Sequence, residues 1–259
     1  MTGNNARVIT EADRRLFHAL AEARVLDGQQ AREITGRKDV SVSTSNARLL
    51  KLTRAGLLKR FFIATDEGGL KALYALTPAS AAAIGVVYRP LQRKSDSVLT
   101  SDPFVLHQLA INSIYVQVKY RPAPHMDIHF VRWLSLSEVL SNAIPLIPDG
   151  YFELEVPAET HSMFCEVDRG TESQKIWTKK TDLYLQLAAT GEFNRLFNRS
   201  RFRVLVVVDT TRRLLEVRKT IAQKTAKIFW FATLSDINRD GLFAAHWLRP
   251  VGDNRLSLL

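Results

Sequence analysis

The sequence predicts an α/β protein, α+β overall, whose 259 residues form two domains. Helical patterns followed by two strand-like runs fill the first third of the chain, whereas strand-like and helical segments alternate in the second half. Residues 89–101 between them are polar and irregular, as is typical of a linker. We therefore expect a helical domain with a β-hairpin at 8–88 and an α/β sandwich at 102–259, each with its own core.

Charge is distributed unevenly along the chain. Residues 1–95 contain 16 lysines and arginines and 8 acidic residues, a balance of +8, whereas the rest contains 20 and 18, a balance of +2. This asymmetry favours an N-terminal domain that binds a polyanion; the alternative is a solvated basic surface.

Several classes of protein are excluded by composition. No stretch approaches the roughly 18 apolar residues of a membrane helix, and residues 1–7 lack the apolar core of a signal peptide. Cys165 is the only cysteine, so no disulfide can form within the chain. We expect a cytoplasmic protein without membrane contact.

The N-terminal pattern is that of a winged helix-turn-helix. Thr10 and Asp13 form a capping box that begins the first helix. Helices are expected at about 10–25, 29–35, 41–52 and 77–85, and strands at 57–64 and 70–76, joined by a turn at 66–69. Three helices followed by a hairpin place the third helix where it can fill the major groove of double-stranded DNA.

DNA contacts are predicted on the third helix and on the hairpin. The outward side of the helix carries small polar and cationic side chains that suit base edges and phosphates, namely Ser43, Thr44, Asn46, Arg48 and Lys51. Phosphate contacts from the hairpin are expected from Lys59, Arg60 and Lys71. The alternative is a winged helix that binds another protein. A homodimer through the 103–117 helix or the fourth helix is a further expectation.

The second domain alternates strands with helices. Helices are expected at about 102–117, 171–189 and 211–223, with a short one started by Ser135 and Glu138. Strands are expected at about 128–131, 147–154, 162–168, 202–208 and 227–233. The near-continuous apolar run at 202–208 is typical of a strand that is buried on both faces of a sheet.

Two of these strands carry acidic residues that can converge. Alternation along 162–168 places Glu166 and Asp168 on the same face, and a neighbouring strand would bring Asp149 beside them. Three oxygen ligands suit Mg²⁺ or Mn²⁺, so Asp149, Glu166 and Asp168 are the predicted metal ligands. The alternative is a network of acids that neutralises a buried lysine without a metal.

That lysine is Lys180, on the helix that a capping box of Thr171 and Gln174 is expected to begin. Helical spacing places it within an apolar stripe of Ile176, Leu183, Tyr184 and Leu187. A lysine that faces the core is costly unless it meets a carboxylate. For this reason we treat the region as a site.

These pieces together resemble the replication-relaxation family of plasmids and other mobile elements, which pairs a winged helix with a domain like the PD-(D/E)XK nucleases. The resemblance covers most of residues 10–250 and includes Leu106–Asn112, Pro148–Phe152, Glu166–Glu172, Lys180, Tyr184, Val204–Val208 and Phe229–Thr233. It implies work on DNA in replication, transfer or regulation of the element, with replication or transfer proteins as partners.

One position departs from the nuclease pattern, which has an acid, one intervening residue and a lysine on the second strand. Asp168 stands where that lysine is expected, and the resemblance implies that Lys180 replaces it from the helix. The predicted catalytic set is then Asp149, Glu166, Asp168 and Lys180, for metal-assisted hydrolysis of a phosphodiester. Two functions stay open: a DNA-binding protein with a degenerate nuclease fold, and an active Mg²⁺-dependent endonuclease or nickase.

Overall fold

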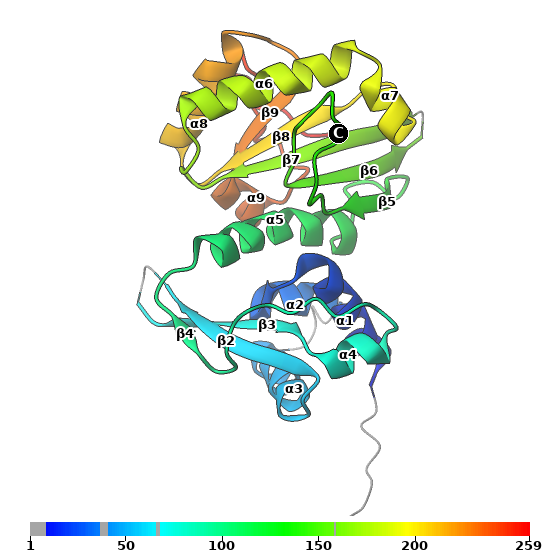
Figure 1. Cartoon of the computed structure of the whole chain (residues 1–259), viewed down its shortest axis with the longest axis vertical. Coiled ribbons are helices and arrows are strands. Elements are labelled where there is room, and N and C mark those ends of the chain that lie inside the picture. Colours follow the sequence, from blue (N-terminus) through cyan, green and yellow to red (C-terminus); the bar gives the residue numbers. More distant parts are fainter. Residues whose placement is uncertain (1–8, 37–40, 66–67, 158) are drawn as a thin grey trace, which may run out of the picture. The chain divides into compact units, whose positions relative to one another are not determined.

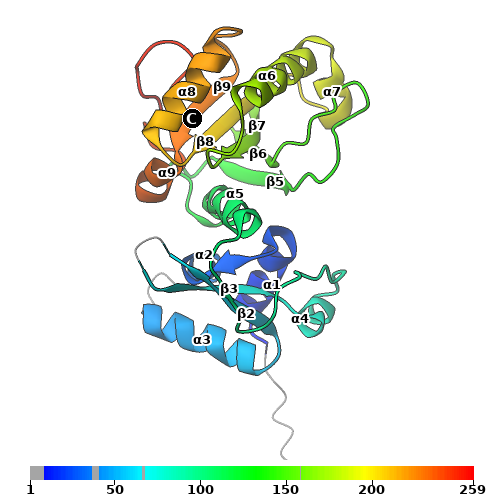
Figure 2. The ribbon, with the colours of Figure 1, turned by 60° about the vertical axis from the view of Figure 1, so that its left-hand side comes forward.

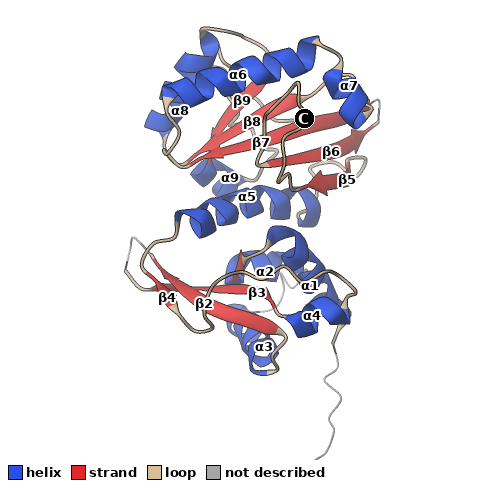
Figure 3. Ribbon diagram, viewed as in Figure 1, coloured by secondary structure: helices blue, strands red, loops and turns tan. Residues whose placement is uncertain are grey.

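The computed structural model describes residues 9–36, 41–65, 68–157 and 159–259. Within these ranges the chain is α+β, as predicted, with two sheets and helices α1 to α9 (Figure 1, Figure 3). It divides into two compact units, Met1–Val116 and Gln117–Leu259. None of the helices in the described part of the chain combines the length and apolar character that crossing a membrane requires.

The first unit consists of short helices and a small sheet. Its elements are α1 (Glu11–Ala23), β1 (Leu26–Asp27), α2 (Gly28–Ile34), α3 (Val42–Arg54), β2 (Leu58–Ala64), β3 (Leu70–Leu76), α4 (Pro78–Ala83), β4 (Val98–Leu99) and most of α5 (Pro103–Tyr120). The strands are ordered β1-β3-β2-β4, and β2 and β3 form the predicted antiparallel hairpin. Figure 2 shows α3 on the outside of this unit, beside the hairpin.

Helices α1, α3 and α4 begin close to the residues that the sequence predicts, and each has a local capping residue or proline at its start. The Thr10 hydroxyl accepts a hydrogen bond from the Asp13 amide at 3.3 Å, and the Asp13 carboxylate accepts one from the Thr10 amide at 2.8 Å. Ser41 caps α3, and Pro78 begins α4. The predicted turn residues Asp66 and Glu67 lie outside the described residues.

The stretch 89–101, expected to be a linker, contributes to the fold of the first unit. β4 within it pairs in parallel with β2, and Leu91 is buried in the same cluster as Phe61 and Leu73. The two-residue strand β1, which pairs with β3, is a second element that the sequence pattern did not indicate. Both additions are too short to produce a periodic signal.

The second unit is a five-stranded sheet with helices. Its elements are β5 (His129–Leu134), β6 (Gly150–Val156), β7 (Glu159–Asp168), α6 (Gln174–Ala189), α7 (Glu192–Phe197), β8 (Arg203–Val208), α8 (Thr211–Ala222), β9 (Phe229–Thr233) and α9 (Leu234–Asp240). The strands follow chain order, with β5, β6 and β7 antiparallel and β7, β8 and β9 parallel. Helices α6, α7 and α8 cover one face over an apolar core that includes Phe164, Tyr184 and Val206 (Figure 1).

Two local predictions in this unit are wrong. Residues 135–138 are not helical, because the backbone turns back at 140–146, where the Leu140 amide donates to the Leu146 carbonyl at 2.9 Å. The predicted helix was short, and a single turn gains little to offset its nucleation cost. Helix α6 begins at Gln174 with Ser173 as its cap, so Thr171 does not form the predicted box.

The buried face of α6 is also shifted by one residue from the prediction. Trp177, Thr181, Tyr184 and Leu187 are buried, whereas Ile176 is 42% exposed. Lys180 lies at the border of this face, and its side chain is 18% exposed. The sequence pattern did not indicate this buried face because the face includes the polar Thr181. The Thr181 hydroxyl can be buried there because it donates to the Trp177 carbonyl at 2.7 Å, within the helix.

Candidate functional site

Helix α3 exposes a polar and cationic face. Leu49 and Leu52 are buried beneath the helix, and spacing of 100° per residue then directs Ser43, Ala47 and Arg54 outward. Of the five predicted contact residues on α3, four are exposed: Ser43, Thr44, Asn46 and Lys51. Arg54 extends this face, and neither it nor Lys51 has a partner within the described ranges. Arg54 was not among the predicted contacts, although its spacing from Ser43 places it on the same face of the helix.

Arg48 is the predicted contact residue on α3 that the fold uses internally. Its Nε donates to Asp13 Oδ1 on α1 at 2.9 Å, and Nη2 binds the other oxygen of the same carboxylate. Burial would raise the pKa of Asp13, but the hydrogen bonds from Arg48 and Thr10 hold it below its usual value. The pair therefore fastens α3 to α1.

The predicted cations of the hairpin also have partners. Lys59 donates to the Leu91 carbonyl at 3.2 Å, and Arg60 binds Asp96 with its two donors at 2.9 and 2.6 Å. Lys71 is half exposed, and its nitrogen lies 3.6 Å from an Asp27 oxygen. An exposed pair of this kind contributes little, so Lys71 can exchange its partner for another anion.

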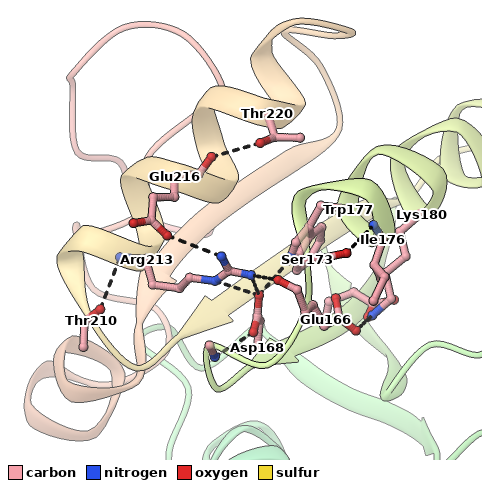
Figure 4. Close-up of polar contacts among 12 residues, drawn as sticks. Glu166, Asp168, Ser173, Ile176, Trp177, Lys180, Thr210, Arg213, Glu216 and Thr220 are labelled. Carbon is pink, nitrogen blue, oxygen red and sulfur yellow. Dashed lines mark hydrogen bonds and ion pairs between the residues drawn. The ribbon is translucent and has the colours of Figure 1, made fainter.

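In the second unit, Glu166 and Lys180 meet as the sequence predicts (Figure 4). Lys180 Nζ lies 2.7 Å from Glu166 Oε2 and 2.5 Å from Glu172 Oε1. The other oxygen of Glu166 accepts a hydrogen bond from the Tyr184 hydroxyl at 2.6 Å. Glu166 is fully buried, so this ammonium and hydroxyl replace the water that its carboxylate would otherwise bind.

Asp149 lies close to this group but binds the backbone. Its Oδ2 accepts a hydrogen bond from the Val167 amide at 2.7 Å, which links the start of β6 to β7. Its charge is near enough to raise the pKa of both Glu166 and Lys180. The structure therefore brings Asp149, Glu166 and Lys180 into one neighbourhood.

Asp168 belongs to a separate group, although it shares a strand face with Glu166 (Figure 4). Its Oδ2 accepts from Trp177 Nε1 at 2.7 Å and from Arg213, whose Nη2 lies 2.5 Å away. Its Oδ1 accepts from the Gly170 amide at 2.7 Å. Arg213 was not predicted at this site, because it lies on α8, 45 positions further along the chain.

The two neighbouring acids of β7 have opposite pKa shifts. Burial raises the pKa of Glu166 to about 7, although Lys180 and Tyr184 counteract part of this effect. Burial also acts on Asp168, but hydrogen bonds from Trp177 and Arg213 hold its pKa below the usual value. Lys180 is buried too, yet the carboxylates around it keep its pKa above the usual value, so it stays charged.

These residues as placed do not fit the predicted metal site. Both oxygens of Glu166, both of Asp168 and Oδ2 of Asp149 already accept hydrogen bonds from the protein. Across the described ranges, no three histidine, cysteine or acidic side chains are grouped so that they could hold one ion. Mg²⁺ is usually held by one or two carboxylates together with water, and to bind Glu166 or Asp168 it would have to displace Lys180 or Arg213.

A further carboxylate, Glu153 on β6, is buried between two arginines. Arg132 lies 2.6 Å from its Oε1 and Arg199 lies 3.0 Å from its Oε2, while the Tyr151 hydroxyl donates at 2.6 Å. Glu153 is a neutralised internal charge, because β6 is covered on both faces there.

Comparison with known proteins identifies one family. The model of the replication-relaxation family matches residues 17–199, which is well over half of the chain. Neither the curated proteins nor the solved structures contain a match. The matched segment includes α3 and the Glu166–Lys180 and Asp168–Trp177 contacts. The chain thus belongs to the replication-relaxation family.

Proposed function

We propose that the protein binds double-stranded DNA, with its first unit acting as a winged helix-turn-helix and α3 as the recognition helix. Membership of the replication-relaxation family supports a role in replication of a plasmid or other mobile element, including its transfer or regulation. The observation that carries the proposal is the outward face of α3, where Lys51 and Arg54 accompany Ser43, Thr44 and Asn46.

The dimensions of α3 support this role. An α-helix with its side chains is roughly 10–12 Å across, and the major groove of B-DNA is roughly 12 Å wide. The small exposed residues allow the helix to approach the base edges, because they add little to its diameter. Lys51 and Arg54 lie towards its C-terminal end, where they can reach phosphates along the groove.

The second unit is proposed to have a structural rather than a hydrolytic role. Glu166 and Asp168 hold α6 and α8 against the sheet through Lys180 and Arg213, and these contacts use the oxygens that a metal would need. A replacement Asp149→Ala is expected to leave DNA binding unchanged. Mg²⁺-dependent cleavage of supercoiled DNA that Asp149→Ala abolishes would instead support the endonuclease or nickase.

The test of DNA binding compares two doubly substituted variants with equal loss of charge. Lys51→Ala with Arg54→Ala removes two cations from α3, whereas Lys175→Ala with Lys179→Ala removes two exposed cations from α6. Fluorescence anisotropy of a labelled duplex is measured across a range of salt concentrations. The α3 variant is expected to lose affinity and to lower the slope of log K against log [salt] by about 1.8, at about 0.9 per phosphate contact.

The α6 variant is the control and is expected to bind like the wild type. Equal affinity of the wild type and the α3 variant at every salt concentration would refute the assignment of α3. Wild-type affinity that does not fall with salt would refute DNA binding through phosphates altogether.

A further inference from the structure

A hollow lined by four arginines lies at the amino ends of the parallel strands in the second unit. Its volume is about 660 Å³, within the range of known ligand sites. Arg199 and Arg201 come from the chain that leads into β8, Arg203 from the first position of β8, and Arg249 from beyond β9. Glu166 and Asp168 lie towards the opposite ends of these strands. We call these four arginines the arginine pocket.

Positive charge in the arginine pocket exceeds the negative charge that it meets. Arg201 pairs with Glu159 and Arg199 with Glu153, whereas Arg203 and Arg249 have no carboxylate within ion-pair distance in the described chain. Four guanidinium groups therefore face two carboxylates, and one of these, Glu153, is also paired with Arg132. The excess of at least two positive charges can be balanced by an anion that enters from solvent.

The two unbalanced arginines are partly withdrawn from water. Both guanidinium groups lie over the ring of Trp230, Arg203 at 5.0 Å and Arg249 at 4.6 Å from its centroid. Burial lowers the pKa of Arg203, and the charges of Arg249 and Arg201 lower it further, while the charge of Glu159 counteracts part of this effect. Burial likewise lowers the pKa of Arg249. Like charges held together in a poorly solvated place favour a bound anion that neutralises them.

The chemistry of the lining indicates which anion. The planar guanidinium fork matches the oxygens of a phosphate in a bidentate manner. The pocket is open to solvent at Arg201, whose side chain is 81% exposed, so the phosphates of an extended chain can reach it. Phe202 is buried in the core and offers no open ring on which a base could stack. These features favour the phosphates of a nucleic-acid backbone over a bound nucleotide.

Strained backbone borders the same hollow. Asn198 and Ile228, which both line it, have φ values of 54° and 53°. The left-handed region is rare for a β-branched residue such as isoleucine. The Ile228 carbonyl is fixed there by the Val204 amide at 2.8 Å, in the ladder that joins β8 to β9. Strain of this kind is concentrated at ligand sites and needs rigid surroundings to persist.

We propose that the arginine pocket binds the phosphate backbone of DNA, as a second contact that does not depend on base sequence. Such a contact goes beyond the role of α3, because phosphate contacts fix position and affinity without reading bases. The pocket is expected to add affinity to any DNA that the protein holds.

The test uses the full chain with α3 already weakened by Lys51→Ala and Arg54→Ala. In this background, Arg201→Gln with Arg249→Gln removes two guanidinium groups from the pocket, and Lys175→Gln with Lys179→Gln removes the same charge from α6. Residual binding to a labelled duplex is measured by anisotropy at low salt and then at rising salt. The pocket variant is expected to lower the salt slope by a further amount of about 1.8, and the α6 variant to leave it unchanged.

Two results would overturn the proposal. One is a pocket variant whose affinity and salt slope equal those of its background, with circular dichroism showing an intact fold. The other is displacement of the duplex by a mononucleotide as effectively as by unlabelled duplex at equal phosphate concentration, which would identify a site for small phosphates. Arg201→Lys with Arg249→Lys keeps the charge and is expected to retain most of the binding.

Failure of this inference can be told apart from failure of the proposed function. The role of α3 is decided by comparing the wild type with the Lys51→Ala and Arg54→Ala variant. Whether the arginine pocket binds DNA is decided by comparisons made only within that variant. The two questions therefore have separate answers.

Discussion

Replacing Lys180 by methionine would leave the buried Glu166 without its cation, at a cost that depends on pH. Methionine preserves most of the apolar stem of lysine, so the change is mainly one of charge. Lys180 Nζ lies 2.7 Å from Glu166 Oε2, and the Glu166 side chain is fully buried. Removing one member of such a pair costs about 3–5 kcal/mol, because the other charge is left uncompensated. We expect this loss at about pH 8, where Glu166 is ionised in the wild type.

The pH dependence follows from the direction of the Glu166 shift. Its pKa in the folded protein is about 7, above the usual 4.5 that applies to the unfolded chain. Between these values the folded protein binds more protons, so the free energy of unfolding falls as pH rises through this window. Without Lys180 the folded-state pKa rises further, and the fall continues to higher pH. At about pH 5 Glu166 is protonated, and the variant is expected to lose only about 1 kcal/mol, from its pair with Glu172.

Urea unfolding followed by tryptophan fluorescence measures this difference in the full chain. The four tryptophans, Trp133, Trp177, Trp230 and Trp247, all lie in the second unit. Fluorescence therefore reports the unit that contains Lys180. The transition midpoint is the quantity to compare, since Lys180 lies 5.3 Å from the centroid of the Trp177 ring and its removal changes the signal of the folded state.

Equal destabilisation at the two pH values would refute this reasoning, because it would mean that packing rather than charge is lost. No destabilisation at either pH would show that Lys180 does not neutralise Glu166. The double variant Lys180→Met with Glu166→Gln is expected to recover most of the loss at high pH, since it removes both charges. Lys179→Met changes an exposed neighbour and is the matched control, expected within about 0.5 kcal/mol of the wild type.

Two further predictions concern packing and capping contacts. Arg48→Met leaves the buried Asp13 without its main donor, and it is expected to lower the free energy of unfolding by about 2–3 kcal/mol at pH values above the usual pKa of that acid. The loss is expected to become smaller as pH falls and Asp13 takes up a proton. Hydrogen exchange of the α1 amides measures this change, and unchanged protection would contradict the prediction. Gly150→Ala would place a methyl carbon 2.7 Å from the Trp133 ring and is expected to cost about 1–3 kcal/mol in urea unfolding. Stability equal to that of the wild type would show that the Trp133 ring yields freely to the added methyl group.

The sequence predicted those parts of the fold that depend on neighbouring residues. The capping box of Thr10 and Asp13, the hairpin of β2 and β3 and the buried strand β8 all follow from patterns within a few positions. Alternation along β7 likewise placed Glu166 and Asp168 on one face, as the structure confirms through their contacts with α6 and α8.

The partners of those residues were harder to predict, because they come from distant parts of the chain. Arg213 reaches Asp168 across 45 positions, and Arg48 reaches Asp13 across 35. Helical periodicity predicts that Arg48 lies outside the core of the helix packing. It does not distinguish an arginine that pairs with a carboxylate of the protein from one that contacts DNA. Three acids on adjoining strands likewise suggest a metal site when their cationic partners are not yet known.

The two acids of β7 also determine how that strand can pair. Side chains alternate along a strand, so a slip of one residue would turn Glu166 and Asp168 to the opposite face. There they would lose Lys180, Tyr184, Trp177 and Arg213 together, while Cys165 and Val167 would face those polar groups instead. Two buried charges without partners cost far more than an apolar strand would lose by the same slip. The acids thus select a single register for β7 during folding, whether or not they act on any substrate.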